Sequence, residues 1–159
     1  MDQGEDKVGS AARVILLAVL AFFALGLALP GAAVYLTVID EWSHSPRGFH
    51  SIEGAIGWLF GIIATGAIAI GLILAGIMLR VLRWQRAPLA SLVLSIVAVG
   101  FVIVTYLVFS DTDTTPNSIE IVFLQAASLA MLVLVALPPF LHWAMAKPIA
   151  ADAPTEPTP

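Results

Sequence analysis

Four apolar segments, each long enough to cross a lipid bilayer, constrain this chain more than any other feature. The first, residues 14–39, has no charged residue over 26 positions. A transmembrane helix needs about 20 residues to cross roughly 30 Å of hydrocarbon. The other three segments lie at about 54–80, 87–109 and 118–143. The sequence therefore predicts an all-α integral membrane protein, with residues 14–146 forming a four-helix transmembrane domain.

Composition supports a membrane environment. Apolar residues make up 60% of the 159 positions and charged residues 11%, whereas soluble domains have about 25% charged residues. The chain has no Cys, which excludes disulfides and thiolate metal sites. Its net charge of −4 and single short Arg cluster argue against nucleic acid as a partner. We expect the lipid bilayer to be its immediate surroundings.

Short polar segments separate the four apolar ones. Residues 40–51 and 110–117 are polar and turn-rich, and only a few residues join the second segment to the third. Short connections favour antiparallel neighbours, so we expect a bundle of four antiparallel helices. Proline occurs late in two segments, at Pro30 and at Pro138-Pro139. We expect the helix to kink or loosen at these sites.

The first segment has one alternative interpretation, a signal peptide cleaved near Ala32-Ala33. The preceding residues 1–13 contain acidic as well as basic side chains, and the apolar run is longer than the hydrophobic region of a typical signal peptide. We therefore expect residues 1–13 to be a short tail followed by a retained helix.

The basic residues near the spans predict the orientation. One side collects six of them and the other only Arg47; the six are Lys7, Arg13, Arg80, Arg83, Arg86 and Lys147. Cytoplasmic segments carry the excess of Lys and Arg, so both termini are expected in the cytoplasm. Residues 147–159, rich in Pro, Ala and acidic residues, are expected to be disordered. The Ala-, Val- and Gly-rich composition suits a plasma membrane, by analogy a bacterial inner membrane.

The second segment carries a regular row of small residues. Alternating steps of three and four give what we call the small-residue stripe: Gly54, Gly57, Gly61, Ala64, Ile68, Gly71 and Ala75. Six of the seven are Gly or Ala, which lets another helix approach closely. The stripe is either a packing seam inside the bundle or an interface with a partner, and Gly66 and Gly76 beside it are candidate positions for a partner helix.

Polar residues of the predicted outer face form a second candidate site. They are Asp40, Glu41, His44, His50, Glu53, Asp111, Asp113 and Glu120. Imidazole and carboxylate ligands suit zinc or manganese. Their spacing matches no known metal motif. The same residues are also explained as solvated loop side chains and as acidic residues in the first turn of a helix. We therefore assign no resident metal and no cofactor. The Arg cluster Arg80, Arg83 and Arg86 either binds lipid headgroups or only sets the topology.

No Asp, Glu, Lys, Arg or His lies deep within the predicted spans, where Gln125 is the one strongly polar side chain. Proton relays, ion-coupled transporters and intramembrane hydrolases usually need ionisable groups at that depth. We therefore expect no catalytic residue and a non-enzymatic accessory or assembly subunit that packs against a membrane-protein partner or a second copy. Two alternatives are a small transporter or channel for a neutral or lipid-like ligand, and a membrane enzyme with the outward metal site.

Overall fold

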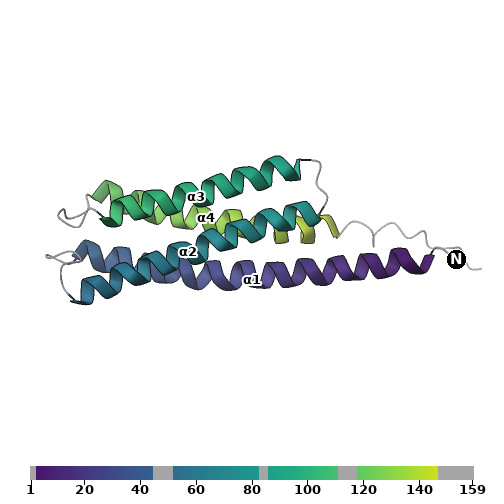
Figure 1. The fold of residues 1–159 in the computed structure, drawn as a ribbon, viewed down its shortest axis with the longest axis horizontal. Helices are drawn as coiled ribbons and strands as arrows, with labels where there is room; N and C mark the ends of the chain where they lie inside the picture. The colour runs from purple at the N-terminus through teal and green to yellow at the C-terminus, as the bar shows by residue number, and fades with distance from the viewer. Residues whose placement is uncertain (1–2, 45–51, 83–85, 111–117, 147–159) are drawn as a thin grey trace, which may run out of the picture.

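The structure is a computed structural model that describes residues 3–44, 52–82, 86–110 and 118–146, with side chains described for 11–44, 56–82, 86–110 and 118–143. Its helices are α1 (Gln3–His44), α2 (Ile52–Val81), α3 (Ala87–Ser110) and α4 (Ser118–Ala146) (Figure 1). All four are long and apolar enough to span a membrane. The prediction of an all-helical chain with four such helices is confirmed.

Helix α2 lies at the centre of the packing. It contacts each of the other three helices, and α1 also contacts α4. The backbones of α3 and α4 both lie close to α2 and only rarely close to each other. Within the most apolar stretch of each helix, 56% of α2 is buried inside the bundle, against 22% of α1, 28% of α3 and 22% of α4. The bundle is therefore organised around α2.

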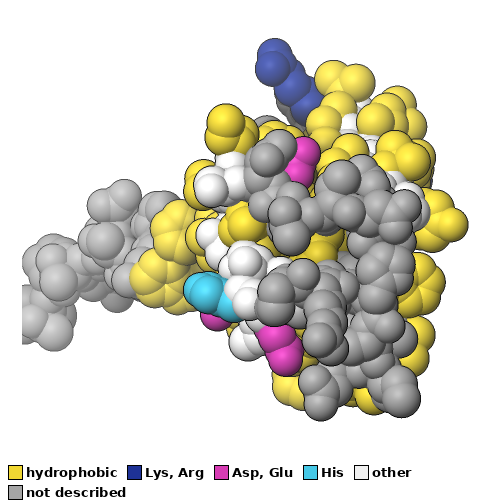
Figure 2. All heavy atoms as spheres, turned by 90° about the vertical axis from the view of Figure 1, so that its left-hand side faces the viewer, with side chains coloured by type: hydrophobic (Ala, Val, Ile, Leu, Met, Phe, Trp, Pro, Cys, Tyr) yellow, Lys and Arg dark blue, Asp and Glu magenta, His cyan; other side chains and the backbone are white. Residues whose placement is uncertain are grey.

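The outside of the bundle is strongly apolar. Large side chains such as Phe22, Ile119 and Val133 are 74%, 82% and 67% exposed. Soluble monomers rarely leave wide apolar patches in water, whereas hydrocarbon solvates such side chains. Figure 2 views the bundle from one end, where described His and acidic side chains are visible and hydrophobic side chains cover the flanks. This surface suits a helix bundle surrounded by lipid.

Helix α1 is longer than the predicted span 14–39. It has 42 residues, about 63 Å at 1.5 Å per residue, so it extends beyond the other helices (Figure 1). The expected tail is helical from Gln3, and the polar segment expected to begin at Asp40 is helical to His44. Ser43 donates to the Asp40 carbonyl at 2.6 Å, and His44 Nδ1 lies 2.8 Å from the same oxygen. These contacts satisfy a carbonyl of the last turn and favour the extra helix.

The prolines do not end their helices. Pro30 lies inside α1, and Pro138 and Pro139 lie inside α4, which continues to Ala146. The residue after Pro30, Gly31, is buried against α2, so packing between helices holds the backbone where one hydrogen bond is missing. Helices α2 and α3 lie within two residues of the predicted bounds 54–80 and 87–109.

Candidate functional site

The small-residue stripe faces into the bundle over its described length. Its five consecutive members from Gly61 to Ala75 are all buried. Gly57 is half-buried and lines a shallow groove of about 410 Å³ together with Thr37 and Glu41 of α1. The surroundings of Gly54 lie outside the described side chains. The structure thus places most of the stripe against the chain's own helices.

Helix α1 approaches the stripe closely at two levels. A Cβ atom added at Gly71 would lie 3.0 Å from Ala28 Cβ and 3.1 Å from the Ala24 carbonyl oxygen. The relation is reversed at Gly31 of α1, where an added Cβ would lie 3.1 Å from the Ala64 carbonyl oxygen of α2. Each helix therefore supplies a glycine where the partner backbone is nearest, as in other close transmembrane contacts.

A matching row of alanines on α1 completes this contact. Ala24, Ala28 and Ala32 are 0%, 0% and 1% exposed and follow each other at intervals of four residues. Residues four apart lie on one face of a helix, so these alanines form the complement of the small-residue stripe. These alanines were not among the predicted packing residues, although the repeated spacing of small residues in an apolar segment was a usable signal.

Aromatic side chains fill the other end of the same seam. The aromatic cluster consists of Tyr35, Trp42, Phe101 and Phe109. The Phe109 ring of α3 lies directly on Gly61, so closely that a Cβ there would overlap it. Ring centroids of Tyr35 and Phe101 are 5.5 Å apart, as are those of Trp42 and Phe109. The missing side chain of Gly61 therefore provides the space for a large ring.

One buried hydrogen bond joins α1 to α3 beside this cluster. The hydroxyls of Tyr35 and Thr105 are 3.1 Å apart, and the two residues are 0% and 1% exposed. Either hydroxyl is able to donate. Among the described residues, no buried side-chain nitrogen or oxygen lacks a hydrogen-bond partner. The Tyr35–Thr105 bond therefore links two helices of the core, and Thr105 is a packing residue that periodicity alone did not identify.

Two glycines beside the stripe have opposite surroundings. Gly76 is covered by α3, since a Cβ there would lie 3.2 Å from Ser91 Oγ. A Cβ atom added at Gly66, by contrast, would have no atom within 4 Å. It lies among the exposed isoleucines of α2, which we call the isoleucine face: Ile56, Ile63, Ile70, Ile73 and Ile77. Of the two candidate positions, only Gly66 is open to a neighbour.

The outward polar residues are only partly described. Asp40 and His44 lie one turn apart on α1, with 3.8 Å between a carboxylate oxygen and Nδ1, and both are exposed. Glu41 and Glu120 are exposed as well. Within the described part of the chain, no three His, Asp or Glu residues gather closely enough to hold a metal ion. Four members of the proposed set lie outside the described side chains, so the metal site stays a prediction; they are His50, Glu53, Asp111 and Asp113.

The basic residues lie at the ends of the spans. Arg80 in the last turn of α2 and Arg86 just before α3 are exposed, and Arg83 lies outside the described residues.

Searches against protein-family models, curated proteins and solved structures find no match for this chain. Functional inference therefore rests on the residues and their geometry.

Proposed function

We propose that the chain is a non-enzymatic integral membrane protein that serves as an accessory or assembly subunit. In this proposal its four helices cross a plasma membrane, by compositional analogy a bacterial inner membrane, in alternating directions. Both termini and the Arg cluster lie in the cytoplasm, following the bias of basic residues. A membrane-protein partner or a second copy of the chain packs against the outer surface.

The observation that carries the proposal is the position of Gly66. Glycine in a helix costs about 1 kcal/mol relative to alanine. At Gly31, Gly61 and Gly71 that cost accompanies a close helix contact within the chain, but Gly66 has no such contact, and neither do Gly26 of α1 and Gly100 of α3. An open glycine among large exposed isoleucines offers a shallow notch to an approaching helix. The isoleucine face around Gly66 is therefore the surface on which we place the partner.

The test is co-purification in mild detergent with a Gly66→Ile variant. A Cβ atom added at Gly66 has no atom within 4 Å, so we expect the fold to accept the larger side chain while the space above Gly66 is filled. Ala130→Ile, at an exposed small residue of α4, is the control for added bulk. We expect loss of the partner, or of the dimer, for Gly66→Ile alone. A monomeric wild-type chain without any associated membrane protein would refute the proposal.

The proposed topology has its own test because the chain has no Cys. Single cysteines at Arg13 and Glu41 should react with a membrane-impermeant thiol reagent from opposite sides of the membrane. Arg13 should react only from the cytoplasmic side. Labelling of both positions from the same side would contradict the alternating arrangement.

One observation favours the transporter alternative. An apolar groove lies beside Pro138 in α4, close to one of the two proline sites suggested as gates. At the other site, the residue after Pro30, Gly31, is packed closely against α2. Flux of a neutral or lipid-like solute into vesicles containing the chain would support transport, and equal leakage with and without the protein would remove this candidate.

A further inference from the structure

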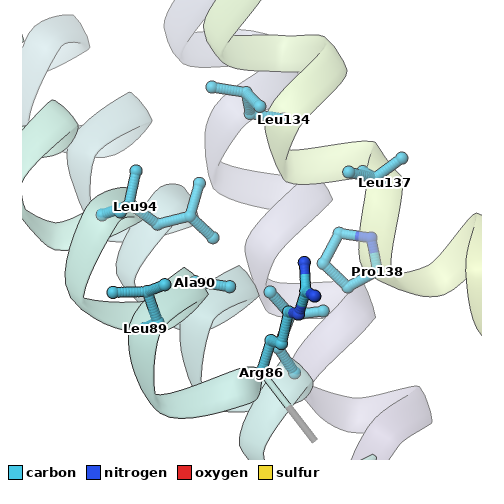
Figure 3. Close-up of a pocket in the computed structure, with 9 residues that line it drawn as sticks. Arg86, Leu89, Ala90, Leu94, Leu134, Leu137 and Pro138 are labelled. Carbon is cyan, nitrogen blue, oxygen red and sulfur yellow. The ribbon is translucent and has the colours of Figure 1, made fainter. Parts of the chain in front are cut away.

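An apolar groove opens between α3 and α4 at the end of the bundle where α3 begins. Its volume is about 330 Å³, within the range of small-molecule sites. The exposed surface of its walls is entirely apolar; the wall residues include Leu89 and Leu94 from α3, and Leu134, Leu137 and Pro138 from α4 (Figure 3). The backbones of α3 and α4 both lie close to α2 and only rarely close to each other, which leaves space for the groove between them.

One cationic side chain lies at the mouth of this groove. Arg86 immediately precedes α3 and is exposed. In Figure 3 its guanidinium points across the groove toward Pro138. No acidic residue lines the groove. The positive end of the α3 helix dipole lies beside the same residue, so a negative charge near Arg86 would be favoured by both groups.

The size and surroundings of the groove favour a single flexible chain over a helix. A helix with its side chains is about 10 Å across, and its ridges need a broad facing surface. The groove is small, is lined by residues of α2, α3 and α4, and has one cationic residue, Arg86, in its lining. In a membrane its walls would otherwise face hydrocarbon. An anionic phospholipid joins an apolar tail to a negatively charged phosphate, which suits apolar walls with a cation beside them.

We propose that this groove binds one anionic phospholipid, with an acyl chain between α3 and α4 and the phosphate at Arg86. The aliphatic walls contact the tail, and the guanidinium pairs with phosphate oxygens, for which its planar donor geometry is well suited. The site is separate from the isoleucine face and does not depend on the subunit function proposed above.

The test is native mass spectrometry of the full chain in detergent, titrated with dioleoyl phosphatidylglycerol or dioleoyl phosphatidylcholine. Arg86→Gln should weaken phosphatidylglycerol binding about fivefold, the effect of one basic residue near an anionic surface. It should weaken phosphatidylcholine binding less, because the choline cation offsets the charge of that lipid's phosphate. Arg80→Gln, an exposed cation that does not line the groove, is the matched control and should have little effect.

A second pair of variants tests the groove itself. Ala90→Trp fills the groove and should reduce binding of both lipids, whereas Ala136→Trp, at an exposed alanine of α4 that does not line it, should not. If Ala90→Trp fails to fold, Val93→Trp at a half-exposed wall position replaces it. Equal losses for Arg86→Gln and Arg80→Gln, unchanged binding in the filled variants, or displacement of the lipid by inorganic phosphate would each overturn the proposal.

Discussion

Replacing Gly71 by alanine tests the close contact between α1 and α2. The added methyl group would lie 3.0 Å from Ala28 Cβ and 3.1 Å from the Ala24 carbonyl oxygen. Neither neighbour is the end of a flexible side chain, so the two helices must move apart by a few tenths of an ångström. The same substitution at Gly66 adds a methyl group with no atom within 4 Å.

The expected magnitude follows from comparing the two variants. Each substitution gains about 1 kcal/mol of helix propensity, and this gain cancels in the difference. Gly71→Ala also carries the cost of overpacking a close contact, typically about 1–3 kcal/mol. We therefore expect Gly71→Ala to be less stable than Gly66→Ala by about 1–3 kcal/mol.

The assay is reversible unfolding of the purified chain in mixed micelles with increasing dodecyl sulfate, followed by tryptophan fluorescence. Trp42 is buried in the aromatic cluster, so its emission should report the loss of packing. Wild type should be about 1 kcal/mol less stable than Gly66→Ala and at least as stable as Gly71→Ala. Equal stability of Gly71→Ala and Gly66→Ala would refute the view that α1 packs on the small-residue stripe.

Three further predictions concern the same seam. Tyr35→Phe and Thr105→Val should each lower stability, with a coupling of about 0.6 kcal/mol in a double-mutant cycle, as for other hydrogen bonds between membrane helices; additive effects would contradict the bond. Phe109→Ala should lower the free energy of unfolding by about 3–5 kcal/mol in the dodecyl sulfate titration. Phe109→Leu should restore part of the stability lost in Gly61→Ala, and no restoration would argue against contact between these two residues. Pro30→Ala should leave the helix content measured by circular dichroism unchanged, because α1 continues through that position; a clear gain would show a break there.

Sequence reasoning predicted the four helices because length and hydropathy alone determine whether a segment can span a bilayer. It was weaker at the ends of α1. Polar residues near Asp40 indicated a turn, but Trp42 packs against Phe109 and the side chains of Ser43 and His44 contact the Asp40 carbonyl, so tertiary and local contacts extend the helix. Neither effect is visible in local composition.

The candidate site was predictable to the extent that it depends on spacing within one helix. Alternating steps of three and four identified the row from Gly61 to Ala75, which is buried. Which glycine meets which helix depends on how the helices are placed, so the covering of Gly76 by Ser91 and the open position of Gly66 required the structure. The groove at Arg86 likewise arises from the separation of α3 and α4. The sequence of one segment does not indicate how far it lies from another.

The most direct test of the central claim is disulfide cross-linking along α2 in native membranes. In the arrangement we propose, the small-residue stripe packs within the chain and the isoleucine face is left for a partner. Cysteines placed singly at Ile63 and Ile70 should form intermolecular cross-links with a second copy, or with a partner carrying a cysteine. Cysteines at the buried positions Ala64 and Ile68 should not. Cross-links from Ala64 and Ile68, with none from Ile63 and Ile70, would contradict the account.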